Sequence, residues 1–535
     1  MAADPEKADP PRNPSQGGTG RFAFWVAAGI LLSRVAGLIR DRVFAHYFGN
    51  SDAADAFRAA FRIPNFLQNL FGEGVLSASF IPVYAGLVGQ GRREEAKRVA
   101  GAVLGLLSLL TALLVAVGVL ATPWLIDAIA PGFTGEKREL AILLVRVLFP
   151  GAGLFVVSAW CLGILNSHRK FFLSYSAPVI WNAAIIAVLV AGGGNPQNRL
   201  AVLVAWGSVA GSLLQFLVQV PGVVRCLRGL RVTLNARIAD VRTVIRNFVP
   251  VFLGRGAVQI SAYVDSLLAS LLPTGAVAAM AYAQTLYLLP VSLFGMSVSA
   301  AELPVLSEEA GADSLDREAL RRRIGTALRR IGFFIVPASV ALLALGDLVS
   351  GAIYQTGRFT RADAVYVWGI LAGAAVGLPA TTFGRLLASV FYAFKNTRTP
   401  LRFSVLRVGL SVALGVPLAL WVPGRLGLDP RWGVAGLTTA AGIVGWVEFL
   451  CLKRALGRQI GRVPVPWAFL GELLACAAAG AAAGWLLRPL CAGWHPLPGS
   501  LAPLAAFGVV FGALAVVFGF PETRRFLPAR FRNPR

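Results

Sequence analysis

Long apolar runs recur along the whole chain and are separated by short polar stretches. A run of about 20 residues is the length that an α-helix needs to cross the hydrocarbon core of a bilayer. The pattern therefore predicts about fourteen transmembrane helices. They lie near residues 22–47, 54–88, 99–130, 139–165, 176–192, 200–221, 243–272, 277–305, 325–353, 364–393, 402–422, 433–451, 466–487 and 500–520.

The composition of the chain agrees with this pattern. Of its 535 residues, 56% are hydrophobic and only 14% are charged, whereas an ordinary soluble protein has about 25% charged residues. A soluble chain of this length would form three or four domains of about 150 residues each. The sequence therefore predicts an all-α polytopic membrane protein rather than a string of soluble domains.

The strong positive charge, +24 at pH 7, first suggests a nucleic-acid partner. Its placement favours another explanation, because basic loops alternate with loops that carry few basic residues. The loops on one side, together with both ends of the chain, hold 33 Lys and Arg residues, and those on the other side hold 8. Basic residues concentrate on the cytoplasmic side of membrane proteins. Both termini are therefore predicted to be cytoplasmic, and no nucleic acid is expected.

Few residues offer enzymatic or metal chemistry. The five cysteines and three histidines are scattered along the chain without the spacing of a metal site. The sequence contains no GxxxxGKS or GxxxxGKT loop, so direct use of ATP is not expected. No enzyme activity and no cofactor are predicted, whereas coupling to Na⁺ or to the membrane potential stays open.

Charged residues occur inside the first predicted span, where each would cost about 2.5–3.5 kcal/mol if it faced lipid. Arg34 and Asp41 are seven residues apart and share one helical face, and Arg40 lies about a third of a turn away. A face that carries several charges predicts contact with water or with countercharges.

The second predicted span carries a polar stripe along its whole length. Pro64 and the glycines at 72 and 74 should break or bend this helix, which frees backbone groups that need a cavity or a neighbour. The stripe recurs at helical spacing and consists of Asp55, Arg58, Arg62, Asn69 and Glu73.

Two interpretations of these charges stay open. One is internal ion pairing, for example of Arg40 with Asp55 or of Arg62 with Glu73. The other is a water-filled cleft for a phosphate or diphosphate, which the planar guanidinium suits. The cleft is favoured because arginines outnumber carboxylates. The six arginines are Arg34, Arg40, Arg42, Arg58, Arg62 and Arg255, and the four carboxylates are Asp41, Asp55, Glu73 and Asp265.

Arg146, Arg385 and Arg407 are weaker candidates, since each lies near a span end or among small residues and could snorkel to the interface. A faint internal repeat is also present, in which residues 40–65 parallel residues 264–290 and Asp41 matches Asp265. A repeat after six spans predicts two six-helix lobes and two additional C-terminal helices, with a substrate site between the lobes.

The motifs SRVAGLIRD, DAFRAAFRIPN and FGEGVLSASFIPV, which lie between residues 33 and 83, resemble the signature of the MurJ (MviN) lipid II flippases of the multidrug/oligosaccharidyl-lipid/polysaccharide exporter superfamily. The resemblance implies two lobes around a central cationic cavity. The expected organisation is a disordered cytoplasmic tail (1–20), an N-terminal lobe (21–222), a C-terminal lobe in two parts (223–400 and 401–456), a helix pair forming a lipid-tail groove (457–521) and a basic cytoplasmic tail (522–535). Further matches are PGF (131–133), NSHRKFFLSYSAPVIWN (166–182), QISAYVDSLLAS (259–270), LPVLS (303–307), YQTGRFT (354–360) and FYAFKNTRTP (391–400).

The resemblance also assigns roles to residues of the first two spans. Arg34 and Arg40 match arginines expected to bind the diphosphate of the substrate. Asp55 and Glu73 match acidic positions of the family, and Arg62 stands where the family has Lys or Arg.

This sequence departs from the family at three positions. Gln68 and Asn69 replace a usual basic pair, and Thr285 stands where the family often has an arginine. Arg255, one span earlier, is a candidate to replace that arginine.

The family's sodium site uses polar residues of spans 7, 11 and 12. Asp265 fits this site, but the predicted span 402–422 has no carboxylate. Asp41 and Asp265 are therefore candidates for gating or ion coupling.

The function expected from the resemblance is flipping of lipid II across the bacterial inner membrane by alternating access. The alternatives are a flippase for another polyprenyl-diphosphate-linked glycan and a non-transporting scaffold for cell-wall enzymes. The expected partners are lipid II or a similar glycan lipid, membrane lipid and cell-wall synthesis enzymes.

Overall fold

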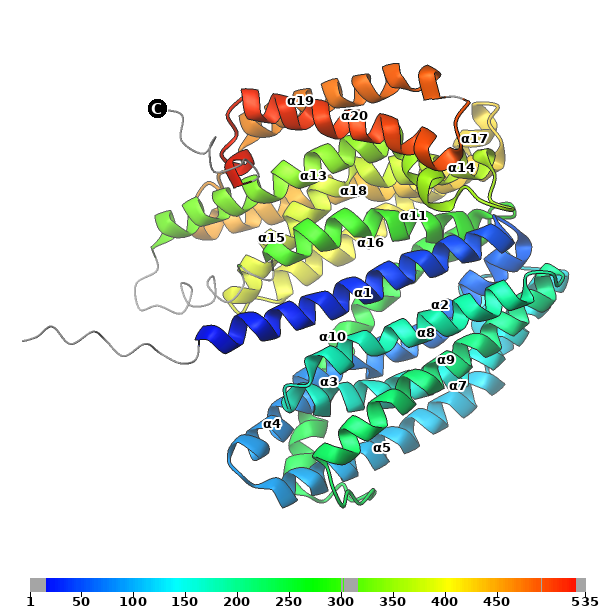
Figure 1. Cartoon of the computed structure of the whole chain (residues 1–535). Coiled ribbons are helices and arrows are strands. Elements are labelled where there is room, and N and C mark those ends of the chain that lie inside the picture. The colour runs from blue at the N-terminus through cyan, green and yellow to red at the C-terminus, as the bar shows by residue number, and fades with distance from the viewer. Residues whose placement is uncertain (1–15, 300–301, 303–315, 492, 526–535) are drawn as a thin grey trace, which may run out of the picture. The chain divides into compact units, whose positions relative to one another are not determined.

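The computed structural model describes residues 16–299, 302, 316–491 and 493–525, and their backbone is helical, without a β-strand (Figure 1). The helices of the first half are α1 (Gln16–Phe48), α2 (Asp52–Phe71), α3 (Glu73–Ser79), α4 (Ile81–Gly89), α5 (Arg93–Leu120), α6 (Thr122–Ile129), α7 (Gly135–Ser167), α8 (Phe171–Gly192) and α9 (Gln197–Cys226). Those of the second half are α10 (Ala239–Ser270), α11 (Ala276–Pro290), α13 (Arg317–Tyr354), α14 (Arg361–Val376), α15 (Leu378–Ala393), α16 (Arg398–Leu420), α17 (Val422–Arg425), α18 (Gly433–Ile460), α19 (Trp467–Leu487) and α20 (Pro496–Val517).

The predicted fold class is confirmed. Each segment predicted to span the membrane is mostly helical where the structure describes it, with short breaks such as those at Gly72 and Gly377. Among the described residues, 11 segments are long and apolar enough to cross a bilayer, or 12 if α14 and α15, which are bent by 44°, count as one. The chain is thus a multi-pass membrane protein, and the total of fourteen spans stays a prediction.

The polar second span is interrupted, as its glycines predict. The helix stops at Gly72 and resumes as α3. A Cβ atom at Gly72 would lie 2.2 Å from the carbonyl oxygen of Gln68, so only glycine fits this turn of the backbone.

The segment 317–330 has Arg on one helical face and apolar residues on the other, a pattern typical of an interfacial helix. It is helical and continues directly into the predicted span 325–353, and together they make α13, which has 38 residues and a kink at Leu345. Asp316 caps this helix, because its carboxylate accepts hydrogen bonds from the backbone N–H groups of Glu318 and Ala319.

The chain divides into two compact units. Unit 1 comprises Met1–Arg40, Phe61–Thr122 and Leu143–Val258, and unit 2 comprises Asp41–Ala60, Pro123–Ile142 and Gln259–Arg535. The division passes through α1, α2, α6, α7 and α10, so part of each of these helices belongs to each unit. The lobe boundaries expected from the sequence stay a prediction.

Each unit has its own apolar packing. In unit 1, Leu76, Phe80 and Trp160 are fully buried in a cluster that joins α3, α4, α5 and α7. In unit 2, Leu345 of α13 packs against Phe507 of α20. By contrast, only 11% of the most apolar stretch within residues 398–425, which include α16, is buried inside the protein. Most of the surface of α16 is therefore available to lipid.

Candidate functional site

The predicted substrate arginines of α1 lie in unit 1. Arg34 is exposed and Arg40 is half-buried. The guanidinium carbon of Arg40 lies 4.9 Å from the ring centre of Trp181, on α8, which is a cation–π geometry.

Trp181 is itself held on three sides. Its indole N–H donates to the hydroxyl of Ser208 at 3.1 Å. Phe61 stacks on the indole at 5.8 Å, and Phe155 meets it edge-on at 5.4 Å. The indole therefore gives Arg40 a fixed aromatic support, which sequence reasoning missed because Trp181 is one of 12 tryptophans in an apolar chain.

The remaining predicted residues of α2 have different surroundings. Arg62 and Gln68 are half-buried, and Asn69 is exposed. Gln68 lines a small pocket of unit 1 together with Asn65 and Ser208. The side chains of Glu73 and Arg255, both predicted to contact the substrate, lie outside the described residues.

In unit 2, Asp41 is buried and forms an ion pair with Arg58, with 3.2 Å between its Oδ1 and Nη2 of the arginine. Thr285, which stands where the family often has an arginine, donates its hydroxyl to Oδ2 of Asp41 at 3.3 Å. The Arg58 guanidinium also lies over the rings of Phe44 and Tyr282, at 4.6 and 5.0 Å. Arg58 is thus a countercharge of Asp41 and is set among aromatic rings.

Asp55 is 1% exposed and has three partners. Its Oδ2 accepts from Nζ of Lys137 at 2.6 Å and from the backbone N–H of Gly275 at 2.8 Å, and its Oδ1 accepts from the N–H of Ala278 at 2.7 Å. The carboxylate therefore caps the N-terminus of α11, where the helix dipole favours an anion. The sequence suggested Arg40 as a partner of Asp55, but Lys137 fills this role.

Asp52 extends this network. Its Oδ1 accepts from Lys137 at 2.9 Å and from the hydroxyl of Thr274 at 2.9 Å. We call Asp41, Asp52, Asp55, Arg58 and Lys137 the α1–α2 latch, because they fasten the turn between α1 and α2 to α7 and α11.

Backbone contacts strengthen the same attachment. Arg42 donates to the carbonyls of Ala352 and Ile353, at 2.8 and 2.6 Å, near the C-terminus of α13. At the turn itself, the hydroxyl of Tyr282 donates to the carbonyl of Gly49 at 3.1 Å. Gly275 has φ +88°, and a Cβ atom there would lie 2.7 Å from a backbone oxygen, so this close approach requires glycine.

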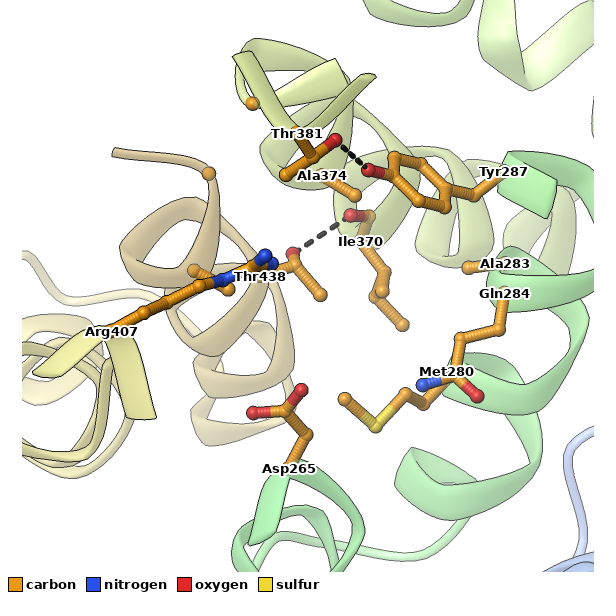
Figure 2. A pocket seen from close by; sticks show the side chains of 13 residues that line it. Asp265, Met280, Ala283, Gln284, Tyr287, Ile370, Ala374, Thr381, Arg407 and Thr438 are labelled. Atoms are coloured by element: carbon orange, nitrogen blue, oxygen red, sulfur yellow. Dashed lines mark hydrogen bonds between the residues drawn. The ribbon is translucent and has the colours of Figure 1, made fainter. Parts of the chain in front are cut away.

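A cavity of about 130 Å³ lies within unit 2, among α10, α11, α14, α15, α16 and α18. In Figure 2 the carboxylate of Asp265 and the guanidinium of Arg407 both border this space. Hydroxyl groups that line the cavity form hydrogen bonds with other residues of its wall. The hydroxyls of Tyr287 and Thr381 lie 2.9 Å apart, and Thr438 donates to the carbonyl of Ile370 at 2.7 Å.

The helices that border this cavity include α10, α16 and α18, which lie over the predicted spans where the family resemblance led us to expect a sodium site. Asp265 and Thr438 supply oxygen atoms that suit a small cation. Arg407, from α16, does not fit, because a guanidinium carries a positive charge and has only donors. The sequence ranked Arg407 as a weak candidate that could snorkel, but the structure places it at the cavity.

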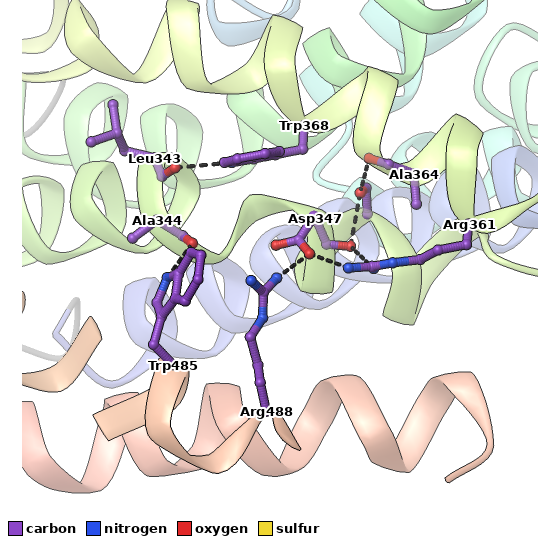
Figure 3. A network of polar contacts seen from close by, with 9 residues as sticks. Leu343, Ala344, Asp347, Arg361, Ala364, Trp368, Trp485 and Arg488 are labelled. Carbon is purple, nitrogen blue, oxygen red and sulfur yellow. Dashed lines mark hydrogen bonds and ion pairs between the residues drawn. The ribbon is translucent and has the colours of Figure 1, made fainter. Parts of the chain in front are cut away.

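A further charged cluster surrounds Asp347, a residue that the sequence analysis did not single out (Figure 3). Its Oδ2 pairs with both Arg361 of α14 and Arg488, which follows α19. Beside it, Leu345 has non-helical backbone angles, φ −127° and ψ 15°, which interrupt α13.

Two indoles satisfy carbonyl groups beside this kink. Trp368 donates to the carbonyl of Leu343 at 2.9 Å, and Trp485 donates to that of Ala344 at 3.0 Å. The cluster therefore joins α13, α14 and α19. A lone aspartate inside the apolar run LLALGDLVSGA was the signal available in the sequence.

Comparison with known proteins gives a consistent result. The family model described as "Lipid II flippase MurJ" matches residues 44–505. A probable lipid II flippase MurJ from Rhizobium meliloti (strain 1021) is 30% identical over 511 residues, which cover 92% of this chain and 91% of that protein. The lipid II flippase MurJ from Burkholderia cenocepacia is 31% identical over 449 residues, which cover 82% of this chain and 84% of that protein.

Solved structures resemble the chain in fold. A structure of lipid II flippase MurJ in an inward closed conformation aligns with a TM-score of 0.75 at 24% identity, and the match covers 92% of this chain and 98% of that one. An inward-facing multidrug transporter of the MATE family aligns with a TM-score of 0.64 at 19% identity, covering 82% and 98%. At these identities the likeness concerns the fold alone.

Proposed function

Because the chain belongs to the lipid II flippase MurJ family, we propose that it flips lipid II, an undecaprenyl-diphosphate-linked disaccharide-pentapeptide, from the cytoplasmic to the periplasmic leaflet of the bacterial inner membrane. The observation that carries this proposal is the family match over residues 44–505. The chain acts as a transporter rather than as an enzyme.

The arginines of unit 1 are the groups that would bind the diphosphate. A guanidinium offers a planar fork of donors that matches two phosphate oxygens at once. Arg40 rests on Trp181, which holds the plane of this fork and lowers the entropy lost when it binds. Arg34, two turns earlier on α1, and Arg62 on α2 would supply further positive charge.

The α1–α2 latch supports an alternating-access mechanism. With both termini on the cytoplasmic side, as the loop charges predict, the turn between α1 and α2 lies at the periplasmic end. The latch then lies at the periplasmic end of unit 2, and we propose that it opens when the headgroup is released on that side. Opening separates the buried Asp55 from Lys137 and from two backbone donors, so the closed form is well defined.

The membrane potential is a suitable driving force for part of this cycle. An unloaded, positively charged binding region is drawn toward the negative cytoplasmic side at about 2.3 kcal/mol per charge for each 100 mV. Return of the empty transporter is therefore the step that the potential would favour. A flipping rate in proteoliposomes that does not respond to an imposed potential would remove this part of the proposal.

The test is complementation of a bacterial strain depleted of its own lipid II flippase. We expect the unmutated chain to restore growth, and Arg34→Ala and Arg40→Ala to fail while the protein still reaches the membrane. Failure of the unmutated chain would favour a different polyprenyl-diphosphate-linked glycan. Rescue by both arginine variants would favour a scaffold, which has no need of these side chains.

A further inference from the structure

We propose that Arg407 is a tethered cation that takes the place of a coupling sodium ion opposite Asp265, so that transport by this chain does not require Na⁺. The part of this proposal that concerns transport rests on the function proposed above, whereas the part that concerns sodium binding does not. We test the two parts separately, in a binding arm and a transport arm.

The first step of the argument is that one cavity brings the two charges together. Asp265 comes from α10, Arg407 comes from α16, and both line the same space of about 130 Å³ (Figure 2). A space of this volume holds a few water molecules or a small hydrated ion. A cation that entered it would therefore share the cavity with the guanidinium.

The second step is that the guanidinium is anchored at the cavity. Nη1 of Arg407 donates to Oε2 of Glu448, on α18, at 3.0 Å, and the other carboxylate oxygen of Glu448 accepts from Ser404 at 3.0 Å. This contact uses one of the five N–H donors of the arginine. Arg407 therefore has donors left for the cavity while one partner fixes its position.

The third step is electrostatic. Arg407 pairs with Glu448 at 3.0 Å and lines the same cavity as Asp265, so its guanidinium places a permanent positive charge at the cavity that Asp265 borders. Arginine does not lose its proton in proteins, so this charge persists throughout the cycle. A mobile cation would meet repulsion from Arg407 in a site of low dielectric, although the oxygens of Asp265 and Thr438 suit it.

The consequence is a difference in coupling. A bound sodium ion leaves the site when the external concentration falls, whereas a side chain stays with its helix. Arg407 therefore supplies a positive charge at the cavity of Asp265 without an ion gradient. The chain is expected to bind and to transport without preference for Na⁺ over K⁺.

The binding arm of the test uses the purified full-length protein in detergent and measures its thermal unfolding in NaCl and in KCl at equal ionic strength. The unmutated protein and Arg407→Lys, which keeps the charge, should show no sodium-specific stabilisation. Arg407→Asn replaces the cation by a neutral oxygen ligand. It should gain a sodium-specific rise in Tm of about 3 °C or more, as expected for an ion present well above its Kd.

The double variant Arg407→Asn/Asp265→Asn is the matched control and should lose the gain. Two results would overturn the proposal: sodium-specific stabilisation of the unmutated protein that disappears in Asp265→Asn, or no gain in a folded Arg407→Asn. The comparison of the unmutated protein with Asp265→Asn needs no Arg407 variant. It therefore tests the proposal even if substitution of Arg407 prevents folding.

The transport arm measures lipid II flipping in proteoliposomes with Na⁺ or K⁺ on both sides. The unmutated chain should change its rate less than about twofold between the two ions, and Arg407→Asn should be about fivefold faster in Na⁺ than in K⁺. A chain that flips no lipid II in either salt fails the proposed function, but it leaves the thermal measurement of sodium binding intact. The two failures are therefore distinguishable.

Discussion

The ammonium group of Lys137 lies 2.6 Å from Oδ2 of Asp55, although the two residues are 82 positions apart and Asp55 is 1% exposed. The pair joins α7 to α2, and the N-terminus of α11 donates two backbone N–H groups to the same carboxylate. A buried carboxylate with three donors is satisfied in this structure, and it would lose those donors if these helix ends separated.

We expect Lys137→Met to lower the free energy of unfolding by about 3 kcal/mol, since removal of one partner leaves a buried charge incompletely compensated. The two backbone donors to Asp55 remain in this variant. The expected loss of unfolding free energy is therefore at the lower end of the range for buried ion pairs that lose one partner. The measurement is equilibrium unfolding of the purified protein in mixed micelles.

Arg138→Met is the matched control, because Arg138 is the next residue of α7 and pairs at 2.6 Å with Asp127, which is 54% exposed. An exposed pair of this kind contributes about 0–1 kcal/mol. Equal losses in the two variants would show that Lys137 and Asp55 behave as a surface pair.

Replacement of Trp181 should weaken the substrate interaction of Arg40 without removing a charge. A cation–π contact of this kind contributes about 0.5–2 kcal/mol, so Trp181→Leu should reduce lipid II binding about three- to tenfold. Trp181→Phe keeps an aromatic face and should lose less. The readout is the affinity of the purified protein for lipid II in nanodiscs.

A separate variant moves Trp181 without replacing it. A Cβ atom at Gly211 would lie 2.9 Å from the indole, so Gly211→Ala should shift the ring and reproduce part of the loss in Trp181→Leu. Full affinity in both folded variants would mean that Arg40 binds without its aromatic support.

The Asp347 cluster predicts a large effect far from the arginines of α1. Asp347→Asn removes the carboxylate shared by Arg361 and Arg488. We expect a loss of about 3 kcal/mol in unfolding free energy, the lower end for a broken buried pair, because both guanidiniums are partly exposed. Protease cleavage between α13 and α14, in the connection that precedes Arg361, should also become faster.

The control for this cluster is Trp368→Phe, which loses one hydrogen bond to the carbonyl of Leu343. A neutral hydrogen bond contributes about 1 kcal/mol. An Asp347→Asn protein no less stable than Trp368→Phe would contradict an ionic clamp between α13, α14 and α19.

The fold class could be read from the sequence, because length and hydropathy are local properties and a membrane leaves few alternatives to helix. The interruption of the second span at Gly72 was also predictable, since glycine near a helix end marks a change of backbone angles. The continuation of α13 from residue 317 into the predicted span 325–353 could not be predicted, because an Arg-rich face is compatible with both a separate interfacial helix and an extended span.

The partners of the charged residues were harder to predict than the residues themselves. Asp41 and Asp55 stood out as intramembrane carboxylates, but Lys137 lies in a predicted loop, and Arg58 was one of the six arginines that outnumber the carboxylates. Which charges pair depends on which helices pack together. The spacing of residues along one helix does not reveal its neighbours. Arg407 was ranked low for the same reason, since Glu448 comes from another helix.

The loop between α7 and α8 predicts a local response to acid. Burial lowers the pKa of His168, and the positive charges of Lys170 and Arg93 lower it further. The ring Nε2 of His168 lies 2.9 Å from the hydroxyl of Tyr84. Because its pKa is lower in the folded than in the unfolded state, the unfolded chain binds more protons, and stability falls as pH drops below about 6.5.

The measurement is hydrogen exchange of backbone amides 165–171 at pH 7.5 and 5.5, corrected for the intrinsic effect of pH. We expect faster opening at pH 5.5, and we expect His168→Asn to remove the difference because its side chain does not titrate. Tyr84→Phe loses the hydrogen bond at both pH values, so it should open faster throughout and keep the pH effect. An unchanged pH effect in His168→Asn would assign the acid response to another group, because the loop would then open without protonation of this ring.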